Sequence, residues 1–171
     1  NSCLRATTTG IIAASAGPVV AFSAGAALTQ LRTLAADATP VVALDDDSGP
    51  SLAEAEATGE SIEPADVHGS ATALLAFTSG TTGRPKGVPL SHANLLSSIQ
   101  SAMLAWRWTA DDVLVHALPL SHQHGLGGVH ATLLAGSSAA IHASFDAARL
   151  ARAVAAERAT VLFAVPAIYQ R

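Results

Sequence analysis

Short apolar runs alternate with segments of helical length along this 171-residue chain, and this alternation limits the folds open to it. Apolar runs rich in β-branched residues are typical of buried strands, whereas apolar residues repeated every three or four positions are typical of helices. The predicted strands are residues 19–22, 41–44, 71–77, 88–90, 113–118, 138–142 and 160–165. The predicted helices are residues 4–16, 26–38, 92–104, 129–135 and 146–158. This order predicts an α/β fold with a mostly parallel sheet flanked by helices.

Residues 19–44 indicate how two of the strands pair. Leu28, Leu31 and Leu34 share one face of the helix between the first two predicted strands. A helix that connects two neighbouring parallel strands makes a right-handed crossover, so we expect a parallel pair here. Residues 51–70 are polar and rich in Glu and Ala, which predicts a short helix followed by a surface connection.

Residues 78–88, with the sequence TSGTTGRPKGV, follow the apolar run 71–77, which predicts a buried strand. Glycines allow a backbone to turn sharply and to bring its N–H groups close to an anion. The Ser and Thr hydroxyls can donate hydrogen bonds to phosphate oxygens, and Lys86 supplies a mobile positive charge. These residue types therefore predict a phosphate-binding loop between two strands.

The spacing of this loop differs from the two commonest nucleotide-binding motifs. In a Walker-type loop the lysine directly follows the second glycine, and a hydroxyl residue follows the lysine. Here Lys86 stands three positions after Gly83 and is followed by Gly87. The dinucleotide-binding pattern G-x-G-x-x-G is also absent.

Residues 78–88 resemble, without a gap, the phosphate-binding signature of the adenylate-forming (AMP-binding) superfamily of acyl- and aryl-CoA synthetases, luciferases and peptide-synthetase adenylation domains. The resemblance implies that a carboxylate attacks the α-phosphate of ATP, giving an acyl adenylate and pyrophosphate. A thiol, coenzyme A, then displaces AMP to give a thioester. Mg²⁺ is implied as well, because the phosphate charges need neutralisation. The expected partners are therefore a small carboxylic acid and coenzyme A.

The resemblance also assigns roles within the loop. Hydroxyl groups would contact the phosphates of ATP, glycines would shape the backbone, and the charge of Lys86 would serve catalysis. The phosphate-binding residues are expected to be Thr78, Ser79, Gly80, Thr81, Thr82, Gly83 and Lys86.

Residues 118–128, with the sequence LPLSHQHGLGG, form a second informative stretch. No cysteine and no carboxylate lies among His116, His122, His124 and His130, so we predict no metal ligands. The glycines also resemble the oxyanion loop of esterases. The nucleophile motif G-x-S-x-G is missing, which argues against a hydrolase.

In the adenylate-forming superfamily, a similar strand end, L-P-x-x-H, precedes a helix that forms a wall of the carboxylate pocket. The resemblance implies that His122 is catalytic and steers a carboxylate oxygen toward the α-phosphorus. It also implies an acyl pocket lined by His122, His124, Gly125 and Gly128. Ser121 stands where the family usually has an aromatic residue. Residues 91–95 resemble the start of the helix after the loop, and we interpret His92 and Asn94 as capping and packing residues.

The resemblance extends over nearly the whole chain. We expect residues 1–171 to be a fragment of the large N-terminal domain, incomplete for turnover and without the C-terminal domain. Within it, residues 71–171 would carry the loop and half of the acyl pocket, and residues 1–70 would precede them. Residues 106–114, 116–126 and 165–171 resemble malonyl-CoA and other short-chain acyl-CoA synthetases. Alternatives are a medium- or long-chain fatty acyl-CoA ligase, a carrier-loading adenylation module, or a non-catalytic nucleotide-binding fragment.

Charge and composition limit the partners of the chain. Nine basic and thirteen acidic residues give a net charge of −4, which argues against a nucleic-acid surface. Residues 6–31 carry no charge, but Gly, Pro and Thr interrupt them, so we predict a buried helix–strand–helix and no membrane span. The single cysteine, Cys3, fits a reducing, cytoplasmic location. The oligomeric state is left open.

Overall fold

The structure is a computed structural model that describes residues 16, 20–23, 25–34, 40–44, 52–59, 63–78 and 85–169. The chain divides into two compact units, residues 1–90 and residues 91–171. The helix predicted at residues 4–16 lies outside the described residues, apart from Ala16. None of the helices that the structure describes combines the length and the hydrophobicity needed to cross a membrane.

The first unit begins with the predicted strand–helix–strand. Its elements are β1 (Ala21–Ser23), α2 (Gly25–Leu34), β2 (Val41–Ala43), α3 (Leu52–Thr58), β3 (Thr72–Thr78) and β4 (Lys86–Ser91). β1 and β2 pair in parallel, which confirms the prediction. Leu28 of α2 packs against Val41 and Ala43 of β2, and all three side chains are buried.

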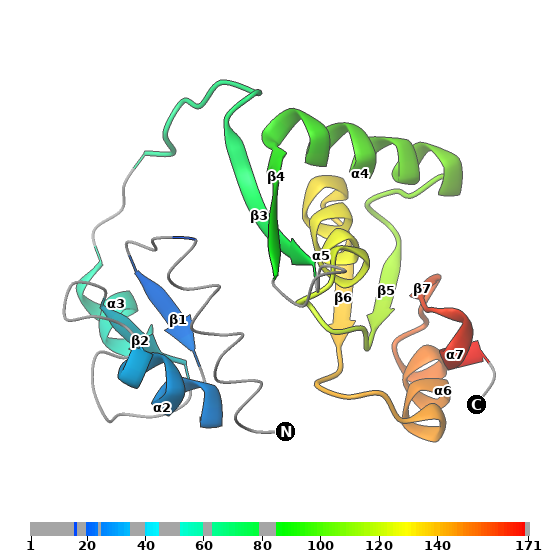
Figure 1. Ribbon diagram of the computed structural model, residues 1–171. Coiled ribbons are helices and arrows are strands. Elements are labelled where there is room, and N and C mark those ends of the chain that lie inside the picture. The colour runs from blue at the N-terminus through cyan, green and yellow to red at the C-terminus, as the bar shows by residue number, and fades with distance from the viewer. Residues whose placement is uncertain are drawn as a thin grey trace. The chain divides into compact units, whose positions relative to one another are not determined.

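β3 and β4 form a two-stranded sheet and run in opposite directions in Figure 1. The prediction of a strand before the loop is therefore confirmed, but the prediction that this strand is buried is wrong. Thr72, Ala73 and Leu75 are exposed, and Phe77 is only partly buried. Among the described residues β4 is the only strand that pairs with β3, so the other edge of β3 is open.

The second unit follows the predicted alternation more closely. Its elements are α4 (His92–Trp106), β5 (Val113–His116), α5 (Gln123–Ala135), β6 (Ser138–Ile141), α6 (Ala147–Ala156), β7 (Val161–Phe163) and α7 (Pro166–Tyr169). The three strands form a parallel sheet in the order β6-β5-β7. This arrangement confirms the α/β prediction of a parallel sheet flanked by helices.

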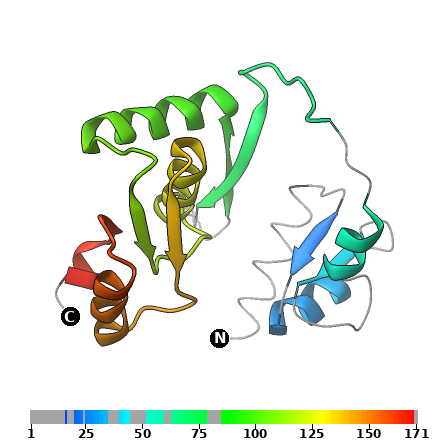
Figure 2. The ribbon, with the colours of Figure 1, turned by 180° about the vertical axis from the view of Figure 1, so that it is seen from behind.

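The sheet of the second unit has an apolar core on each face. Successive residues of a strand point to opposite faces. Leu114 accordingly packs with Ala131 of α5, whereas Val115 packs with Leu150 of α6. Figure 2, the view from behind, shows the same unit with α5 beside β5 and β6. Two helices on opposite faces bury the middle strand, β5, almost completely.

Polar contacts fix the two ends of α4. Ser91 and Asn94 form a capping box, in which Asn94 N–H donates to Ser91 Oγ at 3.1 Å and Ser91 N–H donates to Asn94 Oδ1 at 3.2 Å. At the other end Arg107 adopts the left-handed conformation, and the Trp108 indole donates to Ser137 Oγ at 3.0 Å. The capping role predicted for Asn94 is therefore confirmed.

The carboxylate of Asp112, the residue before β5, forms hydrogen bonds near the N-terminal ends of β5 and β7. Asp112 accepts hydrogen bonds from the hydroxyl of Thr160 at 2.6 Å and from the backbone N–H of Thr109 at 2.6 Å. These bonds lower the pKa of Asp112 from its ordinary value of 3.8, and the bond from Thr160 has the largest effect. The stabilisation of the fold by the ionised Asp112 is therefore present above pH 3.8 and is lost as the pH falls below it.

The main difference from the sequence prediction is the start of α5. Glycines disfavour helices, so the glycine-rich residues 125–128 predict a loop and a helix that begins at residue 129. In the structure α5 begins at Gln123 and includes Gly125, Gly127 and Gly128. Tight packing of two of these glycines explains the difference, because side chains there would collide with their neighbours.

Candidate functional site

The two ends of the predicted phosphate loop lie at the ends of paired strands. Thr78 is the last residue of β3 and Lys86 is the first residue of β4, and both are exposed. Lys86 has no ion-pair partner within the part of the chain that the structure describes, so its ammonium group is available to a ligand. The other predicted phosphate-binding residues lie outside the described residues: Ser79, Gly80, Thr81, Thr82 and Gly83.

His122 lies at the N-terminal boundary of α5. It is the N-cap residue, with extended backbone angles, and its imidazole makes no capping hydrogen bond and is exposed. Its backbone N–H donates to the carbonyl of Pro119 at 3.2 Å, which closes a turn between β5 and α5. The fold therefore fixes the backbone of His122 and leaves the imidazole free to contact a substrate.

Gly125 and Gly128 are buried on the side of α5 that faces the rest of the unit. A Cβ atom at Gly125 would lie 2.3 Å from the carbonyl oxygen of Pro119. A Cβ atom at Gly128 would lie 3.0 Å from Phe163 Cδ2 and 3.3 Å from two ring atoms of His116. These glycines let α5 approach the sheet and the Pro119 turn closely. Their predicted role in an acyl pocket stays a prediction.

Around His124 the structure gathers aromatic residues that are distant in the sequence. The His124 ring stacks on Phe163, with ring centroids 5.1 Å apart and an interplanar angle of 17°. Trp106 and Trp108 each meet Phe163 edge to face, at 5.0 and 5.5 Å. Two cavities, of about 410 and 370 Å³, are both bordered by Trp106, His124 and Phe163. In either cavity an organic group can therefore lie against an aromatic wall.

His116 ends β5 as a fully buried imidazole. Its side chain is 0 % exposed, and neither ring nitrogen has a hydrogen-bond partner among the described residues. Burial lowers the pKa of His116 from its ordinary value of 6.5, and the nearby His124 contributes in the same direction. The Leu118 backbone opposes this shift, although it completes no hydrogen bond to the ring. The native fold therefore disfavours the protonated form of His116.

We predict that the protein loses stability as the pH falls below about 6.5, the ordinary pKa of histidine. In that range the unfolded chain takes up a proton at His116 more readily than the native chain does, so acid favours unfolding. Urea unfolding midpoints between pH 7.5 and 5.5 would measure the effect. In His116→Asn, which has no titrating ring, the decline should be smaller. An equal decline in both proteins would exclude His116 as its cause.

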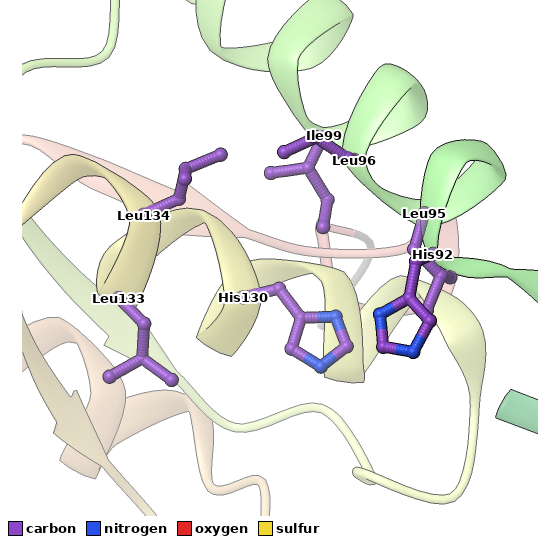
Figure 3. Close-up of a pocket in the computed structure, with 7 residues that line it drawn as sticks. All are labelled: His92, Leu95, Leu96, Ile99, His130, Leu133 and Leu134. Atoms are coloured by element: carbon purple, nitrogen blue, oxygen red, sulfur yellow. The ribbon is translucent and has the colours of Figure 1, made fainter. Parts of the chain in front are cut away.

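A third cavity, of about 400 Å³, lies between α4 and α5 (Figure 3). It is lined by His92, Leu95, Leu96, Ile99, His130, Leu133 and Leu134. Figure 3 shows the rings of His92 and His130 next to each other at one end of this groove. The Nδ1 atom of His130 is buried and has no hydrogen-bond partner among the described residues.

Comparison with known proteins identifies the family. The sequence profile described as "AMP-binding enzyme" matches residues 1–171, the whole chain. The chain belongs to the AMP-binding enzyme family. This membership agrees with the resemblance of residues 78–88 to the phosphate-binding signature of the adenylate-forming superfamily.

Curated relatives of this AMP-binding chain include two kinds of CoA ligase. A feruloyl-CoA synthase of an Amycolatopsis species is 41% identical over 98 residues, which are 57% of this chain and 20% of that protein. The mitochondrial malonate–CoA ligase ACSF3 of Homo sapiens is 36% identical over 124 residues, which are 67% of this chain and 22% of that protein. The chain thus spans about a fifth of the length of these relatives.

Solved structures of the family have the same fold. ATP-bound MatB from Rhodopseudomonas palustris is 35% identical, with a TM-score of 0.84 over 97% of this chain and 33% of that chain. The N-terminal domain of FACL13 from Mycobacterium tuberculosis is 27% identical, with a TM-score of 0.82 over 96% of this chain and 42% of that chain. These similarities confirm the α/β fold and its assignment to the N-terminal domain of acyl-CoA synthetase-type enzymes.

The predicted site of this AMP-binding chain is divided between its two units. Thr78 and Lys86 belong to the first unit, whereas His122, His124, Gly125 and Gly128 lie together at the start of α5 in the second. No group of three histidine, cysteine, aspartate or glutamate side chains converges in the described ranges, so they provide no metal cage there. Sequence reasoning missed Phe163, on which the His124 ring stacks, and Trp106, which meets Phe163 edge to face.

Proposed function

We propose that this chain is part of an enzyme that uses ATP to activate a carboxylic acid as an acyl adenylate and then transfers the acyl group to coenzyme A. The ungapped phosphate-binding signature at residues 78–88, flanked by the paired strands β3 and β4, carries the proposal. Family membership and the CoA ligases among the relatives support it.

The phosphate-binding role rests on the chemistry of the loop. Hydroxyl groups and backbone N–H groups of residues 78–83 would hold the β- and γ-phosphates of ATP. Lys86, exposed and without an ion-pair partner in the described part of the chain, would neutralise charge that develops on the pyrophosphate. Mg²⁺ would bind the phosphates of ATP and neutralise their charge.

The acid-activating role rests on the start of α5. The Pro119 turn fixes the backbone of His122, while the exposed imidazole can donate a hydrogen bond to a carboxylate oxygen. Orienting that oxygen for in-line attack lowers the barrier by positioning. The neighbouring His124, Gly125 and Gly128 would form one wall of the acyl site.

A malonate-like or other short-chain acid is the substrate that we propose, because the chain is similar to malonate–CoA ligase and to MatB. The aromatic wall of Trp106, His124 and Phe163 supports an aryl carboxylic acid as a second candidate. An aryl ring can stack in the cavities beside His124, and a feruloyl-CoA synthase is among the relatives. A cytoplasmic location is part of the proposal and rests on the single cysteine, Cys3.

Acid-dependent exchange of labelled pyrophosphate into ATP tests the first half-reaction in the intact protein that contains this chain. Malonate, acetate, ferulate and decanoate should be supplied separately, and mass spectrometry should follow the acyl-CoA product. We expect malonate or another short acid to support both reactions. Exchange with ferulate alone would instead establish the aryl acid as substrate. Absence of exchange with every acid, in a protein that binds ATP, would contradict the proposed function.

A further inference from the structure

His116 is a buried polar side chain to which the proposed reaction assigns no role. Its exposed fraction is 0%, and neither ring nitrogen has a hydrogen-bond partner among the described residues. A buried imidazole without partners costs stability, so an aliphatic side chain of similar volume would give a more stable core. Because no part of the ring is exposed, neither a substrate nor a metal ion can contact it. Any role of His116 in the reaction must therefore act through the elements packed against it.

The helix that covers His116 is α5. Side chains alternate along a strand, so Leu114 and His116 lie on the same face of β5, and Leu114 packs against Ala131 of α5. A Cβ atom at Gly128 of the same helix would lie 3.3 Å from two ring atoms of His116. Phe163, which is opposite His116 in the β5–β7 register, comes within 3.0 Å of that Cβ position. The ring is thus enclosed between the sheet and the backbone of α5.

The first half of α5 depends on this packing. Its N-cap residue makes no side-chain capping bond, and three of the six residues 123–128 are glycines, which disfavour a helix. The contacts that hold this half are therefore tertiary. One is the close approach of Gly128 to His116, and another is the stack of His124 on Phe163. A segment held in this way can open locally at a lower free energy than the whole unit.

A proton on the enclosed ring has no neutralising group beside it. Burial lowers the pKa of His116, and the charge of His124 on α5 acts in the same direction. The other histidines on the surrounding elements, His130 of α5 and His142 directly after β6, do not act on this pKa. β6 and β7 carry no charged or titratable side chain, and no carboxylate of the described residues acts on the ring. Protonation therefore favours a state in which α5 has moved and water reaches the ring.

We propose that His116 is a positioning residue that releases the first half of α5 from the sheet when the imidazole takes up a proton. Neutral His116 lets this half of α5 pack on β5 and β7. Protonated His116 requires water and shifts the equilibrium toward the released state. α5 begins directly after His122 and carries His124, so the release would withdraw the residues assigned to acid activation. The effect on activity rests on the proposed function, whereas the movement of α5 does not.

Hydrogen–deuterium exchange of the intact protein that contains this chain, with mass spectrometry of peptides from α5, tests the movement. Wild type and His116→Leu are compared at the same pH, which cancels the intrinsic pH dependence of exchange. Between pH 7.5 and 5.5, exchange of residues 123–128 should rise up to about tenfold more in wild type, because a released histidine with its ordinary pKa of 6.5 gains that factor at most. His116→Asn, which also lacks a titrating ring, is the second variant if the leucine variant does not fold.

Two comparisons separate this movement from a general effect of acid. Release of α5 raises exchange in α5 more than in α6, which packs on the opposite face of the sheet, whereas unfolding of the unit raises both equally. His130→Gln removes the other histidine of α5 that has a buried ring nitrogen, and it should keep the pH dependence of the wild type.

Acid-dependent pyrophosphate exchange provides the readout of activity. Wild type should lose rate between pH 7.5 and 5.5 and recover it on return to pH 7.5, and the loss should be smaller in His116→Leu. His116→Leu should also have a higher urea midpoint at pH 7.5, because it removes two unpartnered nitrogens. A merely structural role predicts the opposite, a variant that is less stable and less active at every pH. Equal loss of rate in both proteins would overturn the link to acid activation.

Three outcomes would overturn the proposed release of α5. In the first, exchange of residues 123–128 rises equally in wild type and His116→Leu. In the second, α5 and α6 gain exchange equally, which would make the effect an unfolding of the whole unit. In the third, His130→Gln removes the pH dependence and His116→Leu does not. A wild-type protein without pyrophosphate exchange at any pH would contradict the proposed function and leave the result on α5 unaffected.

Discussion

Replacing Lys86 with alanine should lower the rate of acid-dependent ATP–pyrophosphate exchange about 100-fold, the usual effect of losing one group that stabilises the charge of a transition state. Lys86 is the exposed first residue of β4, at one end of the phosphate loop. It makes no ion pair with other described residues, so its removal should leave the fold intact. Exchange rates at saturating ATP and acid, together with the melting temperature of each protein, provide the measurement.

Two control variants show whether the charge itself or its position matters. Lys86→Arg keeps the positive charge but replaces a compact ammonium with a planar guanidinium, so it should recover part of the rate. Arg152→Ala removes an exposed positive charge from α6 and should leave exchange unchanged. A Lys86→Ala protein as fast as wild type would exclude the proposed role of this lysine, whatever the substrate.

The order of strands and helices was predictable because it depends on local patterns. The β5–β6 and β5–β7 pairs contain short apolar strands, and the segments between them are long enough for crossover helices. The capping role of Asn94 was also predictable, because cap residues act on the backbone within one turn. The burial of individual strands was less predictable. β3 is apolar, but its exposure depends on which other elements pack over it, and the sequence of the strand itself does not show which elements those are.

Only part of the candidate site could be predicted from sequence. The loop signature and the L-P-x-x-H strand end were recognisable because each is a continuous stretch. The stack of His124 on Phe163 joins residues 39 positions apart, from α5 and β7 (124 and 163), through packing that no short motif contains. The groove histidines, His92 and His130, are similarly separated. The sequence predicted a capping or packing role for His92 and excluded His130 as a metal ligand, and gave no reason to place the two together.

Replacing Gly125 with alanine should destabilise the protein by about 3 kcal/mol, at the upper end of the usual cost of overpacking. The added Cβ would lie 2.3 Å from the Pro119 carbonyl oxygen and 2.9 Å from its carbonyl carbon. Both are backbone atoms, which cannot rotate away as the end of a side chain can. For a chain of this size the melting temperature should fall by about 6–12 °C, measurable by circular dichroism.

Gly127→Ala is the matched control, because the same substitution two residues away meets nothing within 4 Å. Gly127 lies inside α5, where alanine is the better helix former, so this variant should gain about 0.5–1 kcal/mol. If the two substitutions change the free energy of unfolding in opposite directions, helix propensity cannot be the cause, since both substitutions improve it. The difference between the two free-energy changes would therefore measure the contact between α5 and the Pro119 turn.

The same pair of variants tests where α5 begins and how His122 is held. If α5 started near residue 129, as glycine content alone predicts, residues 125 and 127 would both lie in a loop and the two substitutions would have similar effects. In the structure Pro119 accepts the His122 N–H at 3.2 Å, so a collision at this carbonyl must also displace His122. Gly125→Ala should consequently lose pyrophosphate exchange even at temperatures where it remains folded. Gly127→Ala should leave the turn and the position of His122 unchanged, because its new methyl group meets nothing within 4 Å. Gly127 borders the cavity beside His124, so the exchange rate of this variant reports on that cavity and its melting temperature is the control.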